Sequence, residues 1–216
     1  MKSLCRVLIV IFIVVFSSAF NASTSTFKGC IPQTNKTIRQ QQELDKIAEA
    51  ALSIINPNIQ YDPSYFLINY PNGDVPKNKG VCTDVIIRAY RKLNIDLQKE
   101  VHEDMISHFS LYPNIKKWGL HKTDTNIDHR RVPNLEVFFS RKGQKLPITQ
   151  NAKDYKSGEI VTWTINNKYP HIGIITNKKS PDGNRLMIVH NVGGGQVLED
   201  CLFKYKIVGH FIYLKK

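Results

Sequence analysis

One cysteine has the residue type and the position that nucleophilic chemistry requires. Cys82 follows Gly80 and Val81 and opens a segment with helical periodicity, so we expect it in the first turn of a helix. Unpaired backbone N–H groups and the positive end of the helix dipole stabilise negative charge there, which should lower the pKa of the thiol. The same N–H groups could form an oxyanion hole for acyl transfer. Cys82 is therefore the predicted nucleophile.

Two histidines stand at the outer ends of neighbouring predicted strands. His171 opens the first strand and His190 closes the second. If a hairpin joins these strands, the start of one lies beside the end of the other, and the two side chains become cross-strand neighbours. His171 is then the expected general base for Cys82, and His190 the group that orients it. Asn191 is a rival for the orienting role, although alternation along a strand should turn its side chain to the opposite face.

Candidate substrate-binding residues lie between a loop and a predicted helix start. Arg130 or Arg131 could bind a substrate carboxylate bidentately, with Asp128 beside them. The alternative is a structural loop in which Asp128 pairs with an arginine. His102 and His108 invite a metal interpretation, but residues six apart do not share a helix face. We expect neither a metal ion nor a cofactor.

The elements that must position these residues change in character along the chain. Helical spacing of apolar residues comes first, and β-branched strands joined by turn residues follow, which predicts an α+β domain over residues 37–216. Residues 112–131 show no periodicity. The expected helices cover residues 37–55, 81–93, 97–109 and 133–142, and the expected strands cover residues 159–165, 171–176, 186–190 and 208–214.

Length and composition agree with one globular core. The chain has 216 residues, of which 42% are hydrophobic, and this is too short for two sizeable domains. Thirty Lys and Arg against eighteen Asp and Glu give a formal charge of +12, which favours an anionic partner. No helix-turn-helix, zinc-finger or RNA-binding signature is present, so we expect an anionic envelope polymer rather than nucleic acid.

The first residues have the form of a secretory signal peptide. Lys2 and Arg6 precede an apolar run over residues 7–16, and small residues end at Ala19, where cleavage is expected. An uncleaved anchor is the alternative, but the run is shorter than the roughly 20 residues of a spanning helix. Residues 20–36 are polar and are expected to be a flexible mature N-terminus. The protein should be periplasmic or secreted, with no stable membrane span after cleavage.

Export would place the cysteines, four in the full sequence, in an oxidising compartment, where thiols form disulfides if their geometry allows it. Cleavage removes Cys5 and leaves Cys30, Cys82 and Cys201, an odd number. A disulfide between Cys30 and Cys201 is possible and would leave Cys82 free for chemistry. A buried, inert cysteine is the alternative for the unpaired thiol.

The motifs around these residues resemble two families. The passages Gly158-Glu159-Ile160-Val161 and His171-Ile172-Gly173-Ile174 resemble motifs of the NlpC-type cell-wall cysteine peptidases, whose papain-like core packs a cysteine-bearing helix on an antiparallel sheet. A more specific resemblance, from about residue 62 to the C-terminus, is to the YijF-like family of exported proteins of unknown function (DUF1287-type). The matching passages are YPNGDVP at 70–76, GVCTDV at 80–85, VHEDM at 101–105, NIDHRRVPNL at 126–135 and HNVG at 190–193.

The NlpC-type resemblance implies a papain-like α+β fold in which Cys82, His171 and His190 are nucleophile, base and orienting residue. The expected function is that of an exported cysteine hydrolase acting on an amide bond of peptidoglycan or a related peptide. Two alternatives remain open: a non-catalytic envelope-binding protein on the same scaffold, and a thiol acyltransferase.

Overall fold

The computed structural model describes residues 33–215, and the chain from Gln33 onward forms one compact unit. The predicted signal peptide (residues 1–19), the predicted flexible segment as far as residue 32, and Cys30 lie outside the described residues. Within residues 33–215, no helix combines the length and the apolar character that a membrane crossing requires.

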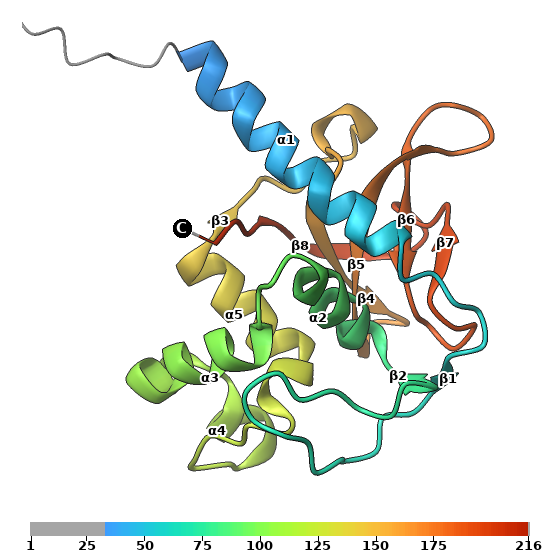
Figure 1. Ribbon diagram of the computed structural model, residues 1–216. Helices are drawn as coiled ribbons and strands as arrows, with labels where there is room; N and C mark the ends of the chain where they lie inside the picture. Colours follow the sequence, from blue (N-terminus) through green and yellow to red (C-terminus); the bar gives the residue numbers. More distant parts are fainter. Residues whose placement is uncertain (1–32, 216) are drawn as a thin grey trace, which may run out of the picture. The chain divides into compact units, whose positions relative to one another are not determined.

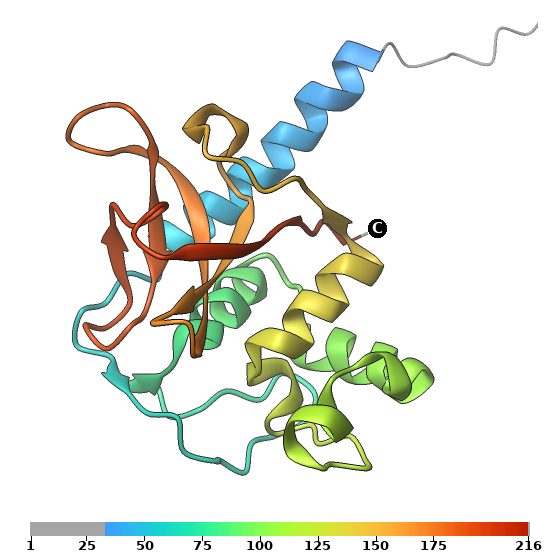
Figure 2. The same cartoon turned by 180° about the vertical axis from the view of Figure 1, so that it is seen from behind.

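A six-stranded antiparallel sheet lies at the centre of this unit (Figures 1 and 2), with the strand order β3-β8-β4-β5-β6-β7. Its strands are β3 (Gln144–Lys145), β4 (Ile160–Ile165), β5 (Tyr169–Lys179), β6 (Leu186–His190), β7 (Val197–Glu199) and β8 (Lys206–Ile212). The longer strands β4, β5, β6 and β8 are those that the sequence predicts. The strands β3 and β7 have two and three residues, too few for alternation to reveal them.

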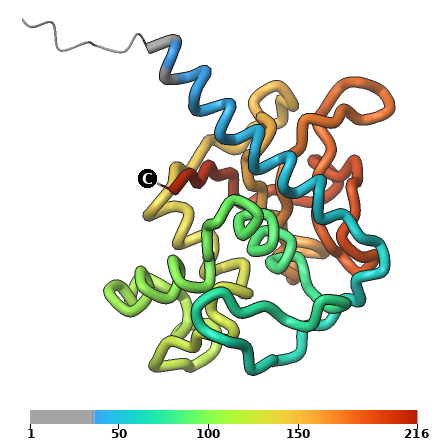
Figure 3. The backbone as a smooth tube through the Cα atoms, viewed as in Figure 1, coloured from blue at the N-terminus to red at the C-terminus, as the bar shows by residue number. Residues whose placement is uncertain are grey.

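Helices α1 and α2 pack against β5 on one face of the sheet, as the chain trace also shows (Figures 1 and 3). The α-helices are α1 (Gln33–Leu52), α2 (Cys82–Lys92), α3 (Leu97–His108), α4 (Asn114–Trp118) and α5 (Val132–Lys142). Short 3-10 turns are η1 (Phe109–Leu111), η2 (Asp128–Arg130) and η3 (Ala152–Asp154), and β1 (Gln60–Tyr61) pairs in parallel with β2 (Lys79–Gly80). The predicted α+β class, with the cysteine-bearing helix packed on an antiparallel sheet, is confirmed.

Apolar residues fill both faces of the sheet. Alternation sends Ile172 and Ile174 of β5 into a core shared with the helices, whereas Ile175 belongs to a smaller cluster on the opposite face. The smaller cluster consists of Tyr155, Val161, Trp163, Ile175, Ile188, Cys201, Leu202 and Ile207. Since His171 shares its face with Ile175, its ring lies on the side of this second cluster, 5.7 Å from the Trp163 ring between centroids.

The helix boundaries differ from those expected. Helix α1 begins at Gln33 rather than at residue 37, because extending an established helix by one turn costs little even where the residues are polar. It ends at Leu52 rather than at residue 55, since the N–H groups of Ile54 and Ile55 donate to carbonyls only three residues back and Asn56 pairs with Gln196. The segment 112–131 contains α4 and η2, which are too short to produce a periodic pattern.

Candidate active site

The first turn of α2 holds Cys82 at the edge of the main core. The Asp84 carboxylate accepts a hydrogen bond of 2.6 Å from the Val81 N–H and so caps the helix start. Farther along α2, Val85, Ile86 and Ala89 are fully buried and fix the helix on the sheet. Cys82 itself is only 4% exposed. The sequence therefore places a thiol at a helix N-terminus, as predicted, but in a site with almost no solvent.

The Cys82 sulfur lies against the residues that flank His171. The Ile172 N–H donates a hydrogen bond to it, and Cys82 and Pro170 line the same cavity. The Tyr61 hydroxyl, which lines the same cavity, donates a hydrogen bond to the sulfur. Within residues 33–215, no hydrogen bond joins Cys82 directly to the His171 ring, which lies on the side of the second apolar cluster, whereas Cys82 belongs to the core shared with the helices.

Opposing effects act on the protonation of Cys82. Burial raises the pKa of the thiol to about 12, and the Asp84 carboxylate acts in the same direction. The N–H groups of Ile172, Thr83 and Cys82 lower this pKa, but they do not offset the burial. The expectation that the helix start lowers the pKa of Cys82 is therefore wrong, because a thiolate excluded from water loses more than the backbone donors supply.

His171 and His190 do come together. The register pairs Ile174 with Val189, which makes the two histidines diagonal rather than directly opposite neighbours. The His171 Nε2 atom lies 2.8 Å from His190 Nδ1, a hydrogen-bond distance. Gly173 allows this approach, since a Cβ atom there would lie 3.2 Å from the His190 Cβ and 2.6 Å from an Ile188 methyl group.

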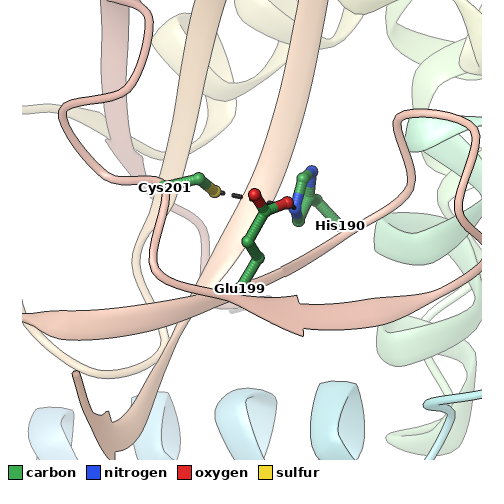
Figure 4. Close-up of side chains that lie close together, drawn as sticks. All are labelled: His190, Glu199 and Cys201. Carbon is green, nitrogen blue, oxygen red and sulfur yellow. Dashed lines mark hydrogen bonds and ion pairs between the residues drawn. The ribbon is translucent and has the colours of Figure 1, made fainter. Parts of the chain in front are cut away.

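A carboxylate extends this pair. Glu199 on β7 is opposite Ile188 of β6, so it is a diagonal neighbour of His190, and its Oε2 lies 2.9 Å from His190 Nε2 (Figure 4). The other oxygen, Oε1, accepts a bond of 2.5 Å from Lys204. We refer to His171, His190 and Glu199, joined in this order, as the relay.

The charges in the relay fix the direction of its hydrogen bonds. Hydrogen bonding from Lys204 keeps the pKa of Glu199 below its usual value, so this carboxylate is an acceptor only. Burial lowers the pKa of His190, and it lowers that of His171 to about 3, so both rings are neutral. His190 must then carry its proton on Nε2 and accept on Nδ1, and His171 must donate from Nε2. The His171 Nδ1 atom then carries no proton, and its lone pair can accept one.

Comparison with known sequences assigns the family. The model of the family described as a domain of unknown function, DUF1287, matches residues 48–213. The uncharacterized protein YijF of Escherichia coli (strain K12) is 46% identical over 194 residues, which cover 90% of this chain and 93% of that protein. The chain belongs to the DUF1287 family. The predicted YijF-like resemblance is thereby confirmed.

Solved structures similar to this DUF1287 protein include two from other organisms. NlpC1 from Trichomonas vaginalis is 13% identical with a TM-score of 0.42, and the match covers 81% of this chain and 45% of that one. An N-acetylmuramoyl-L-alanine amidase from Bacteroides uniformis ATCC 8492 is also 13% identical, with a TM-score of 0.49 and coverage of 81% of this chain and 100% of that one.

The predicted substrate-binding residues of this family member have different environments. The Arg130 guanidinium forms a bidentate pair with Asp84, at 2.9 and 3.0 Å, and both side chains are 2% exposed. Asp128 is buried and contacts Arg131 at 3.3 Å, the loop pairing that the sequence offered as an alternative. Arg130 and Asp128 are therefore occupied within the protein. Arg131 stacks on Trp118 at 4.4 Å and lines the Cys82 cavity, so it remains a candidate for binding substrate.

Sequence reasoning missed two residues of the DUF1287 site. Glu199 was not found because β7 is too short to be recognised, although a strand pairing with β6 would have placed its side chain diagonal to His190. Tyr61 has no sequence signal of its own, because its contact with Cys82 depends on the parallel pairing of β1 with β2 beside the α2 start. Neither pairing has a local sequence signal.

Proposed function

We propose that this DUF1287 protein is an exported cysteine hydrolase that cleaves an amide bond of peptidoglycan or a related peptide. The observation that carries the proposal is the relay, which ends in a bare His171 Nδ1 while both residues flanking His171 contact Cys82 or its cavity. In this proposal Cys82 is the nucleophile, His171 the general base, and His190 and Glu199 position the base.

The reaction begins with a neutral thiol and a neutral imidazole. His171 Nδ1 removes the Cys82 proton as the sulfur attacks the substrate carbonyl carbon, and the imidazolium that forms is stabilised through His190 by Glu199. Once the sulfur is bonded to carbon it carries no negative charge, and the Cys82 N–H donates to the oxyanion instead. The imidazolium returns its proton to the leaving amine, which leaves a thioester on Cys82. Water, deprotonated by His171, attacks the thioester carbon and releases the acid product, and the imidazolium gives its proton to the departing Cys82 sulfur, which restores the neutral pair.

The cavity beside Cys82 favours an extended peptide with a carboxylate. It has a volume of about 260 Å³ and is lined by aromatic and proline side chains together with Arg131. One guanidinium nitrogen of Arg131 donates to Asp128, and no other hydrogen bond from this guanidinium occurs among the described residues, so donors remain for a substrate carboxylate. Peptidoglycan stem peptides supply both the amide bond and carboxylates.

The envelope as the place of action is supported by features of the sequence. The signal-peptide pattern predicts export, and the formal charge of +10 that remains without residues 1–19 favours an anionic polymer. The resemblance to NlpC-type motifs favours peptidoglycan as that polymer. Localisation to the periplasm or the exterior belongs to this proposal.

Product analysis with purified wall fragments tests the proposal. The chain without residues 1–19 is incubated with soluble muropeptides, and products are identified by liquid chromatography and mass spectrometry. Cleavage with a new amine and a new carboxylate is expected for the wild type and for His121→Ala, a control at an exposed histidine. Cys82→Ala and His171→Ala should lose at least a thousandfold in rate. Equal cleavage by Cys82→Ala would contradict the proposal.

The burial of Cys82 favours one alternative, a non-catalytic wall-binding protein on the same scaffold. A thiol with a pKa of about 12 and 4% exposure fits an inert core residue as well as a protected nucleophile. Binding to wall fragments without turnover, unchanged in Cys82→Ala, would establish this alternative. Transfer of the acyl group to an added amine instead of water would identify an acyltransferase in the same assay.

A further inference from the structure

A second cluster of reactive side chains lies at the far end of the relay. His190 Nε2, a Glu199 oxygen and Cys201 Sγ lie within 4.8 Å of one another and converge on one point (Figure 4). They come from β6, from β7 and from the segment that follows β7. His190 and Cys201 are buried, at 0% and 1% exposure, whereas the Glu199 side chain is 33% exposed. The cluster is therefore fixed on two sides and open to solvent on the third.

The two spacings around His190 Nε2 are close to those of a tetrahedral metal site. Zinc bonds to nitrogen, oxygen and sulfur would hold the ligand atoms about 3.3 to 3.6 Å apart. Cys201 Sγ lies 3.6 Å from His190 Nε2, which agrees without any movement. Glu199 Oε2 lies 2.9 Å from the same nitrogen, so its partly exposed side chain needs a shift of about half an ångström to reach the spacing of zinc ligands.

We propose that His190, Glu199 and Cys201 form a binding site for a divalent cation of the zinc class, with a fourth position open to solvent beside Glu199. The mixture of imidazole, carboxylate and thiolate is a donor set that zinc accepts and that calcium and magnesium do not. Binding breaks the Cys201 S–H bond, forms the metal–sulfur bond and releases that proton to solvent.

Lys204 competes with the cation for Glu199. Its ammonium lies 2.5 Å from Glu199 Oε1, the oxygen that does not face His190, and its side chain is half exposed. A metal ion on Oε2 would repel this ammonium, which is free to turn into solvent. Lys204→Gln should therefore raise the affinity for the metal severalfold, whereas Lys179→Gln, an exposed lysine on another strand, should not.

Metal binding would reverse the hydrogen bonds of the relay, a consequence that rests on the proposed function. A cation on His190 Nε2 displaces the proton of that nitrogen, so the neutral ring carries its proton on Nδ1 and donates to His171 Nε2. His171 must then hold its own proton on Nδ1, the nitrogen that would accept the thiol proton of Cys82. The site would thus act as an inhibitory switch, because the bound cation leaves the base without its lone pair.

Cobalt binding tests the site without any activity measurement. Co²⁺ is titrated into the wild type, Cys82→Ala, Cys201→Ala and Cys201→Ser, and the thiolate-to-metal absorption in the near ultraviolet is recorded before displacement by Zn²⁺. The band should appear in the wild type and in Cys82→Ala and should be absent from both Cys201 variants. Glu199→Gln, on the exposed side of the cluster, should weaken binding at least tenfold.

Three results would overturn the site: no thiolate band in the wild type, a band that persists in both Cys201 variants, or a band lost in Cys82→Ala. If the protein turns over wall fragments, Zn²⁺ should inhibit the wild type and leave Cys201→Ala active. Inhibition that is equal in both proteins would overturn the switch. A protein without turnover would refute the proposed function, and the cobalt titration would still decide the metal site.

Discussion

At Cys82, burial and the helix N-terminus act on the same sulfur atom in opposite directions. The N–H groups of the first turn favour the thiolate, and exclusion of water favours the thiol. Burial prevails and raises the pKa of Cys82 to about 12, so the resting site holds an uncharged pair rather than a thiolate and an imidazolium. Under the proposed mechanism, the nucleophile is generated by proton transfer when substrate is present.

Alkylation of Cys82 should therefore be slow in the folded protein at pH 8. The difference between a pKa of 9.0 and one of about 12 lowers the thiolate fraction about a thousandfold relative to the unfolded chain. The rate should still rise above pH 10, where an ordinary thiol with a pKa of 9.0 is close to its plateau. Iodoacetamide labelling with peptide mapping measures this rate in native buffer and in urea. Faster labelling of the native protein would refute a neutral resting thiol.

Glu199 fixes the protonated nitrogen of His190 and, through it, that of His171. Glu199→Gln can donate as well as accept, so it should allow both ring tautomers and reduce kcat about 10- to 100-fold with little change in KM. Nitrogen-15 shifts of the histidine rings give a readout that a merely structural role would not move: a bare His171 Nδ1 in the wild type and a mixture in the variant. Glu43→Gln, at an exposed glutamate, is the control.

At the scale of elements, the Asp84–Arg130 pair joins the start of α2 to η2. The pair is buried on both sides, and Thr83 also donates to the Arg130 carbonyl oxygen at 3.0 Å. This contact sets the position of Cys82 relative to the cavity wall that η2 provides. It explains why the Arg130 guanidinium has a structural rather than a substrate-binding environment.

Arg130→Met should leave the Asp84 carboxylate buried without its partner. The expected loss is about 3–5 kcal/mol in the free energy of unfolding, measured by urea denaturation at pH 7. Lys99→Met, which breaks an exposed pair with Glu103, should cost less than about 1 kcal/mol. A loss for Arg130→Met no larger than that of the control would show that the pair does not hold α2 and η2 together.

Elements with a strong apolar periodicity can be predicted from the sequence, whereas short strands that exist only through hydrogen bonds to a neighbouring strand cannot. The Cys82 helix and the strands of His171 and His190 could be predicted because apolar spacing and turn residues mark them locally. Strand β7 has three residues, and its identity depends on hydrogen bonds to β6, so Glu199 could not be foreseen. The raised pKa of Cys82 could not be predicted from the sequence for a related reason, since burial depends on the packing of the whole fold.

At the scale of the whole molecule, the excess of basic residues should act as a non-specific affinity for anionic polymers. Without residues 1–19, which contain Lys2 and Arg6 and no acidic residue, the formal charge is +10, and binding to peptidoglycan sacculi should weaken strongly between about 0.05 and 0.5 M NaCl, because salt screens exposed charges. Cosedimentation measures the bound fraction, and Cys82→Ala should bind like the wild type. Binding that is independent of salt would show that charge does not contribute.

Trapping of the covalent intermediate tests the central claim most directly. A muropeptide substrate is mixed with enzyme, the reaction is quenched with acid within the first turnover, and intact mass and peptide mapping locate any added acyl group. The account predicts a thioester on Cys82 in the wild type, none in Cys82→Ala and much slower formation in His171→Ala. An acyl group on another residue, or fragments released by Cys82→Ala at the wild-type rate, would contradict it.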